Sequence, residues 1–177
     1  MKLSAHFDLC EFTRSESAKR EGVSNNPTPE HLENIKTLCE KVLEPIRAKF
    51  GPINISSGYR SADLNHFIGG SLNSDHCKGR AADIDMDGHG GEVSNTEIFN
   101  YIKDNLDYDQ LIWEFGNKEK PDWVHVGYRG KDNRKQTLRA SKVNGRLLTR
   151  LTNQTNQYEQ NQKCGCHRRY PFSFLPS

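Results

Sequence analysis

Between positions 28 and 46, apolar side chains recur at three- and four-residue steps, the spacing of one face of an α-helix. Thr28 provides an N-cap, and Pro29 occupies the first helical position, where no hydrogen bond is lost for want of its N–H. Pro45 is expected to kink or tighten this helix near its end. The apolar stripe that should face the core consists of Leu32, Ile35, Leu38, Cys39, Val42 and Ile46.

Shorter patterns predict the other elements. Residues 81–85 alternate small or apolar side chains with acidic ones, as a strand with one polar face does. Residues 3–26 indicate an irregular N-terminal arm, with Phe7, Leu9 and Phe12 as apolar anchors. Further strands are expected at 53–57, 110–115 and 123–128, and further helices at 62–67, 95–105 and 134–142.

These elements together predict an α+β fold, in which a small antiparallel sheet has helices packed on one face. A chain of 177 residues is long enough for one domain with its own core. Residues 1–145 form the expected domain. Beyond it the sequence is rich in Asn, Gln and Thr, so 146–177 is expected to be a poorly ordered polar tail.

Composition narrows the classes of function. A formal net charge of +2 is too small to indicate nucleic-acid binding. The sequence has no apolar segment near the roughly 20 residues of a membrane span and begins without a secretory pattern. We therefore expect a monomer that is synthesised in the cytoplasm and does not insert into membranes. The cysteines are odd in number and irregularly spaced, so no disulfide framework is expected, and Cys164 and Cys166 are interpreted as free thiols.

The segment S-D-H-C-K-G-R-A-A-D-I-D, at 74–85, concentrates side chains that can bind metals. His76 lies in the loop before the expected strand, and Asp83 lies on the polar face of that strand. His125 lies on another expected strand, on the face opposite its valine neighbours. Each of the three is by itself more often a surface residue, but two histidines and one carboxylate would leave a fourth position open for water, as in catalytic zinc sites. Weaker candidates for ligands are His66, His89 and Cys77.

Four blocks follow one another along the chain: S-G-Y-R-S, then L-N with I-G-G, then S-x-H-x-x-G-x-A-x-D, then W-V-H-V. Together with Q-L-I-W-E and N-R-K-Q, their order and spacing resemble the zinc D-Ala-D-Ala carboxypeptidase family, peptidase M15, in its phage and prophage branch. The resemblance implies that His76, Asp83 and His125 bind one Zn²⁺ per chain. It leaves Asp75 and Asp85 as bystanders.

Zinc hydrolysis also needs a carboxylate that takes a proton from water and passes it to the leaving amine. Two residues are candidates. Asp122 lies three residues before His125, a spacing at which several family members carry an acid, and Glu114 ends the Q-L-I-W-E strand. Strand alternation favours Glu114, unless the strand that carries His125 begins only after Asp122.

The resemblance also places Arg60, of S-G-Y-R-S, at the substrate, where a guanidinium can steady an oxyanion or a peptide carboxylate. Ser74 is expected to orient the ligand loop or to hydrogen-bond the substrate. Tyr59 is expected to shape the turn and is a further candidate for substrate contact.

The resemblance implies a zinc peptidase that cuts a peptide bond in the stem peptide of bacterial peptidoglycan, as a D,D-carboxypeptidase or an endolysin-type endopeptidase. It would act on the cell wall after release through a partner pore, or from a virion. The alternative is a non-catalytic zinc-containing module of the same fold, which binds cell wall or protein in a phage structural component.

Overall fold

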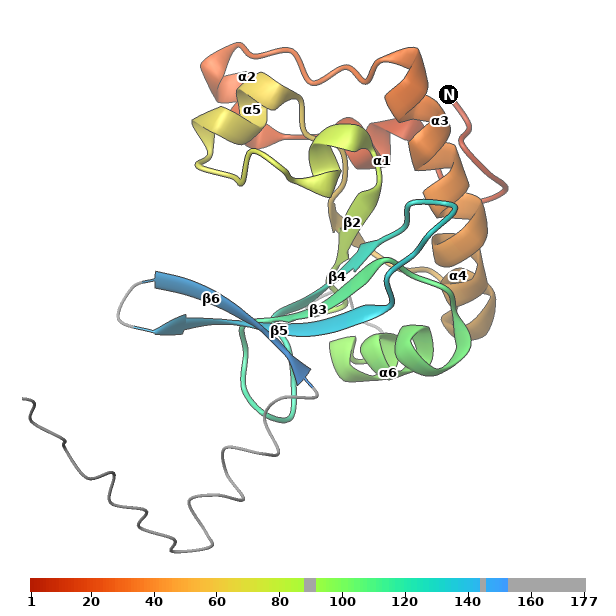
Figure 1. Cartoon of the computed structure of the whole chain (residues 1–177). Coiled ribbons are helices and arrows are strands. Elements are labelled where there is room, and N and C mark those ends of the chain that lie inside the picture. Colours follow the sequence, from red (N-terminus) through yellow and green to blue (C-terminus); the bar gives the residue numbers. More distant parts are fainter. Residues whose placement is uncertain (88–91, 144–145, 153–177) are drawn as a thin grey trace, which may run out of the picture.

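The computed structural model describes residues 1–87, 92–143 and 146–152. Helices and strands are mixed along the chain, as Figure 1 shows. The helical elements are α1 (Leu9–Thr13), α2 (Glu16–Glu21), α3 (Pro29–Leu38), the π-helical η1 (Cys39–Leu43), α4 (Glu44–Phe50), α5 (Ala62–Phe67), the 3-10 turn η2 (Asp75–Lys78) and α6 (Asn95–Asn105). The strands are β1 (Ile55–Ser57), β2 (Ala81–Ile84), β3 (Gln110–Glu114), β4 (Trp123–Gly127), β5 (Gln136–Val143) and β6 (Arg146–Leu151).

The strands form one six-stranded sheet in the order β1-β2-β4-β3-β5-β6. Neighbouring strands are antiparallel, except that β3 and β5 run parallel. The α+β prediction is confirmed, but the sheet is mixed, so the prediction of an antiparallel sheet is wrong at this pair. The cause is the chain path: β4 returns beside β3, and the chain then crosses to the other side of β3, where β5 runs in the direction of β3.

The segment 134–142, predicted as a helix, is instead mostly strand β5. Leu138 and Ala140 are buried two residues apart, which is the period of a strand. Strand β6 pairs with β5 inside the region expected to be a tail, so the sheet extends to Leu151. The dipeptide Asn144-Gly145 between the two strands is a sequence signal for a hairpin that the apolar pattern does not contain. Residues 153–177 of the expected tail, including Cys164 and Cys166, lie outside the described residues.

Several helices begin where the sequence predicts. The Thr28 hydroxyl accepts a hydrogen bond from the His31 N–H at 3.2 Å, which caps α3. The Ser61 hydroxyl caps α5 in the same way, and α5 and α6 have the predicted bounds. The disturbance expected at Pro45 takes the form of a widened turn, because the Glu44 N–H bonds back five residues to the Cys39 carbonyl. Proline cannot donate to the carbonyl four residues before it, and a wider turn relieves the clash of its ring with that carbonyl.

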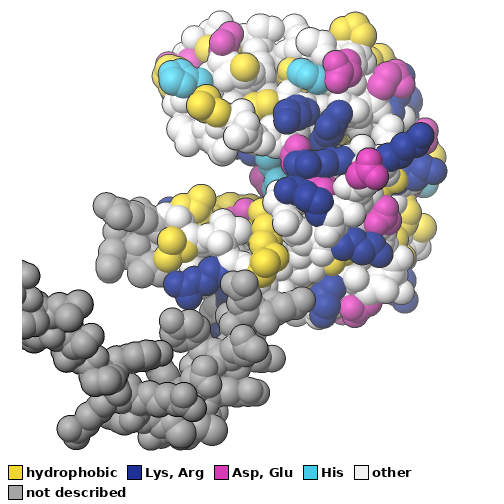
Figure 2. All heavy atoms as spheres, viewed as in Figure 1, with side chains coloured by type: hydrophobic (Ala, Val, Ile, Leu, Met, Phe, Trp, Pro, Cys, Tyr) yellow, Lys and Arg dark blue, Asp and Glu magenta, His cyan; other side chains and the backbone are white. Residues whose placement is uncertain are grey.

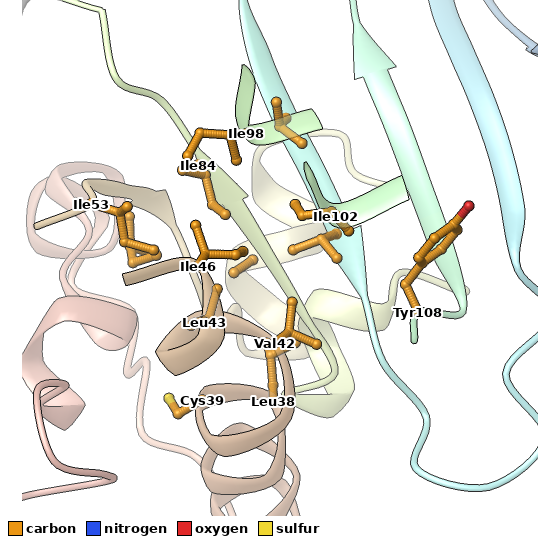
Figure 3. Close-up of a cluster of buried hydrophobic side chains, with 14 of the residues drawn as sticks. Leu38, Cys39, Val42, Leu43, Ile46, Ile53, Ile84, Ile98, Ile102 and Tyr108 are labelled. Atoms are coloured by element: carbon orange, nitrogen blue, oxygen red, sulfur yellow. The ribbon is translucent and has the colours of Figure 1, made fainter. Parts of the chain in front are cut away.

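The hydrophobic core lies between one face of the sheet and the helices α3, η1, α4 and α6 (Figure 3). Ile84 of β2 points into this core together with Leu43 of η1, Ile46 of α4 and Ile98 of α6. All four side chains are fully buried. Because side chains alternate along a strand, every second residue of β2, β3 and β4 must point to the opposite face, away from this core. That second face carries the polar residues described below.

The N-terminal arm is more regular than predicted, because it contains α1 and α2. It is held against the turn that follows β1: the Tyr59 N–H donates to the Phe12 carbonyl at 2.8 Å, and the Asn25 side chain accepts from the Ser61 N–H at 2.7 Å. At Gly58 a Cβ atom would lie 2.6 Å from the Phe12 Cα, so only glycine permits this close approach. The arm therefore fixes the position of the S-G-Y-R-S turn.

The pairing of β6 with β5 leads to a prediction. A chain that ends at Val143 should melt at a lower temperature than one that ends at Thr152, because β5 loses the strand that covers its edge. Both proteins should bind zinc equally, since no metal candidate lies on β6. Calorimetry and metal analysis of the two truncated chains test this, and equal melting temperatures would show that β6 adds nothing to the fold.

Candidate metal centre

Two of the three predicted ligands come from neighbouring strands. Asp83 on β2 and His125 on β4 are directly opposite in the antiparallel ladder, so their side chains lie on the same face of the sheet. Their neighbours Ile84 and Val124 are likewise opposite each other, and both are buried in the core. The register that fills the core therefore also brings Asp83 and His125 together.

The third ligand, His76, comes from η2, the turn that leads into β2. Its Nδ1 donates to the Gly58 carbonyl at 2.6 Å, which directs the lone pair of Nε2 toward the other two ligands. Gly79 ends η2 in a left-handed conformation (φ 67°), and a Cβ there would lie 2.4 Å from the His31 carbonyl oxygen. Gly79 thus lets the turn pack closely against the first turn of α3, which places His76 over β2.

The candidate ligand atoms converge closely. His125 Nδ1 lies 2.8 Å from Asp83 Oδ1, His76 Nε2 lies 3.3 Å from the same oxygen, and the two nitrogens are 3.2 Å apart. In a tetrahedral zinc site with bonds of about 2.0–2.2 Å, ligand atoms lie roughly 3.3 Å from one another. The donor set and its spacing therefore fit a zinc ion held by these three residues.

The surroundings shift the pKa values of the three candidate ligands in different directions. Burial alone would raise the pKa of Asp83, but the two imidazoles beside it outweigh that effect and hold the pKa well below its ordinary value. Burial lowers the pKa of His76, so its imidazole is neutral and can offer a lone pair. Burial acts the same way on His125, but the hydrogen bond and charge of Asp83 raise its pKa overall. Zinc binds neutral imidazoles and an ionised carboxylate, so the forms favoured at Asp83 and His76 are the ligand forms, whereas a metal ion would have to replace the proton that Asp83 favours on His125.

Of the two candidate bases, the structure brings Glu114 to the cluster. Leu111 and Trp113 of β3 face the core, so Glu114 faces the same side as the ligands, and it is half-buried there. Burial raises its pKa, the charge of Asp83 raises it further, and His125 and Arg60 act to lower it. These interactions place the Glu114 carboxylate within electrostatic range of the metal candidates.

Asp122 lies outside β4, which begins at Trp123, so strand alternation does not fix its direction. Its side chain is exposed, its N–H donates to the Glu114 carbonyl at 2.9 Å, and its own carbonyl accepts from the Asn95 side chain at 2.8 Å. The charges that shift the pKa of His125 are those of Asp83, Glu114 and Arg60. The backbone groups of Asp122 therefore hold the start of β4 in place, and its carboxylate takes no part in these hydrogen bonds.

Two residues of the S-G-Y-R-S turn differ in their surroundings: Arg60 lies beside His76, and Tyr59 packs against His31. Arg60 donates its N–H to the His76 carbonyl at 3.3 Å, and its charge acts on the pKa values of His76, His125 and Glu114. Its Nε is buried and has no hydrogen-bond partner among the described residues. The Tyr59 ring is buried, and its hydroxyl lies 3.2 Å from His31 Nδ1, which identifies it as a packing residue of the turn.

Ser74 directly precedes η2. Its carbonyl accepts from the Cys77 N–H at 3.1 Å, and its hydroxyl interacts with the Cys77 thiol, so it orders the loop that carries His76. The weaker ligand candidates do not join the cluster: His66 is exposed on α5, and His89 lies outside the described residues. Cys77 points toward Ser74 and Arg60, and burial raises the pKa of its thiol.

The ligand cluster lies on the open face of the sheet. In Figure 2 a hollow separates the part of the molecule that contains α2 and α5 from the β5–β6 hairpin, and histidine and acidic side chains are visible at its inner end.

None of the helices in the described part of the chain is long and apolar enough to cross a membrane.

The chain matches the family model of Peptidase M15 over residues 5–127. The match contains all three candidate ligands and Glu114. The chain belongs to the peptidase M15 family. No curated protein matches the chain. Members of this family are zinc-dependent peptidases, and the His76, Asp83 and His125 cluster is a possible site for the metal of an M15 metallopeptidase.

The motifs of this M15 peptidase do not predict one feature: Asp75, expected to be a bystander, is part of an ion-pair network in which the carboxylates are buried and the arginines are partly exposed. Arg129 Nη2 lies 3.2 Å from Asp75 Oδ2, and Arg129 Nε lies 3.0 Å from Asp109 Oδ2. Asp109 is fully buried and also accepts a 2.8 Å hydrogen bond from Arg134 Nε. The only sequence signal is a pair of arginines after the W-V-H-V strand, too weak to assign partners.

The network ties the turn that carries His76 to the segment after β4. Asp75 is 8% exposed, so its charge depends on Arg129 for compensation. Asp75 directly precedes His76, and the Arg80 N–H also donates to the Asp75 carbonyl at 2.9 Å. Replacing a residue that orients a metal ligand without binding the metal itself typically weakens metal affinity by about 10–100-fold.

The first prediction for this site concerns metal content. The purified protein should hold about one zinc per chain, and His76→Ala should lose it because two remaining ligands hold a divalent ion poorly. His66→Ala is the control and should keep its zinc, since His66 lies exposed on α5. Elemental analysis together with circular dichroism tests this. A folded His76→Ala protein that retains equimolar zinc would exclude the assignment.

The second prediction concerns Arg129. Arg129→Met should weaken zinc binding by about 10-fold in chelator competition, because η2 loses an anchor. Arg134→Met is the matched control: it removes bonds to buried Asp109 but leaves the Asp75–Arg129 pair. Both variants should melt lower, but only Arg129→Met should lose zinc affinity well below its melting temperature. Equal zinc affinities in the two variants would show that the network stabilises the fold but does not position His76 for the metal.

Proposed function

We propose that this M15 metallopeptidase hydrolyses a peptide bond in the stem peptide of bacterial peptidoglycan, as a D,D-carboxypeptidase or an endolysin-type endopeptidase. The observation that carries the proposal is the three-ligand cluster, with Glu114 on the same face of the sheet and Arg60 in the turn that hydrogen-bonds to His76. Support for this substrate comes from the resemblance of the motif blocks to D-Ala-D-Ala carboxypeptidases. The proposal includes action at the cell wall.

The proposed chemistry assigns a role to each group. His76, Asp83 and His125 would hold a zinc ion with one position open for water, and the ion would supply a polarised carbonyl and a bound water with a pKa of about 7. Glu114 accepts the proton of the attacking water and delivers it to the leaving amine, which makes it general base and then general acid. Glu114 lies on β3, two residues along from Ile112, which is opposite His125, so its side chain is on the same face of the sheet as that ligand.

Arg60 is suited to the negative charge that develops on the carbonyl oxygen. Its guanidinium lies within electrostatic range of His76, His125 and Glu114, and its buried Nε has no partner among the described residues. A donor already fixed beside the reacting carbon stabilises charge without reorganising. The pairing of a candidate base with this donor favours catalysis over a module that only binds.

The third prediction ranks the two carboxylates. Glu114→Gln keeps the size of the side chain but cannot accept a proton, so peptidoglycan cleavage should fall about 10²–10⁴-fold with zinc retained. Asp122→Asn should cost far less, because Asp122 supports the chain through its backbone groups. Mass spectrometry of fragments released from purified peptidoglycan measures the rate and identifies the bond that is cut.

The outcomes separate the alternatives. The reverse ranking, with zinc bound in both variants, would assign the role to Asp122. A zinc-loaded wild-type protein that releases no fragment from peptidoglycan, yet binds it, would support the non-catalytic module instead.

A further inference from the structure

A groove of about 280 Å³ lies beside the ligand cluster, between the N-terminal arm, the turn after β1 and α5. We call it the α2–α5 groove. Its lining includes Arg14 and Ser17 from the arm, Ser57 and Arg60 from the turn, and Leu64 and Ile68 from α5 and the residue after it.

The groove adjoins the metal candidates on the same face of the sheet. Ser57 lies opposite Asp83 in the β1–β2 ladder, so the two side chains share a face, one strand spacing of about 4.8 Å apart. Arg60 lines the groove and also acts on the pKa of His125 and Glu114. A substrate whose reacting carbonyl lies at the metal would therefore extend into this groove.

The charges around the groove favour an anion. Neither Arg14 nor Arg60 forms an ion pair with any residue that the structure describes, and Arg14 is exposed at the rim. The one carboxylate in the lining, Glu16, is paired with Lys19 at 2.7 Å. Two guanidinium groups without a direct ion pair among the described residues therefore border the groove, although Arg14 acts on the charge of Glu16 and Arg60 on that of Glu114. The opposite wall is apolar, and Ile68 there is 45% exposed.

We propose that the α2–α5 groove binds the segment of the substrate next to the scissile bond, and that Arg14 pairs with a carboxylate of that segment. The aliphatic part of the segment packs on Leu64 and Ile68. A guanidinium is the side chain best matched to a carboxylate, because it can donate two parallel hydrogen bonds. This inference rests on the proposed function and adds that the peptide must be anionic on this side.

Kinetics and binding test the role of Arg14. Arg14→Ala should raise KM for a stem pentapeptide about 10-fold with kcat unchanged, as expected when an interaction is equally strong in ground and transition states. Arg14→Lys should recover part of the loss. Arg20→Ala is the matched control, since Arg20 lies on the same arm, is exposed and is paired with Glu21 away from the groove lining.

Amidated peptides identify the carboxylate. The pentapeptide is compared with versions amidated at its C-terminal carboxyl or at its glutamyl carboxyl. Amidation of the group that Arg14 contacts should weaken binding to wild type and should abolish the difference between wild type and Arg14→Ala. A difference that persists after both carboxyls are amidated, or an Arg14→Ala protein that binds like Arg20→Ala, would overturn the proposal.

Titration calorimetry in the Glu114→Gln background measures the same affinities without turnover. If the wild-type protein cleaves no peptidoglycan and the pentapeptide still binds in an Arg14-dependent way, the proposed function would be refuted while the contact of Arg14 with a peptide carboxylate would stand. If the wild-type protein cleaves peptidoglycan and Arg14→Ala cleaves it with the same KM and kcat, the proposed function would stand and the role of Arg14 would be refuted.

Discussion

The pairing of Asp83 with His125 across β2 and β4 is the constraint on which the site depends. Strand side chains alternate with a period of two, so a slip of one residue would turn both groups toward the core and bring Ile84 and Val124 to the open face. Burying two large apolar side chains is worth several kcal/mol, roughly 1.5–3 kcal/mol each. The core packing of α3, η1, α4 and α6 thus fixes the register, and the register fixes two ligands.

The third ligand is held by contacts from outside the sheet. His76 is fixed through its ring by the Gly58 carbonyl and through its turn by Gly79 against α3 and by Asp75 against Arg129. Gly58 is in turn fixed by its contact with Phe12 of the N-terminal arm. The arm, which carries no ligand, therefore contributes to the geometry of the metal site. The family match includes this arm, since it begins at residue 5.

Local pattern was enough to predict the strands of the site and the direction of their side chains. Alternation placed Asp83, His125 and Glu114 on the polar face because each has apolar neighbours on both sides. It could not predict the parallel entry of β5, which depends on the path of the chain around β3. Nor could it predict the partner of Asp75, because Arg129 is 54 residues away in the sequence and the pair forms only after β4 has joined β2.

The order of the strands places different groups on the two sides of the ligand cluster. Across the open face the sheet runs β1, β2, β4, β3, so the α2–α5 groove lies at one side of the ligands and Glu114 lies at the other. Arg60 lies on the groove side, where under the proposed function it would act on the carbonyl oxygen of the substrate, with Glu114 on the opposite side. A peptide that crosses the strands from the groove toward β3 passes over the ligand cluster in between. Under the proposed function, the group for proton transfer and the group for charge stabilisation would therefore flank the scissile bond, and neither would have to move for the other to reach it.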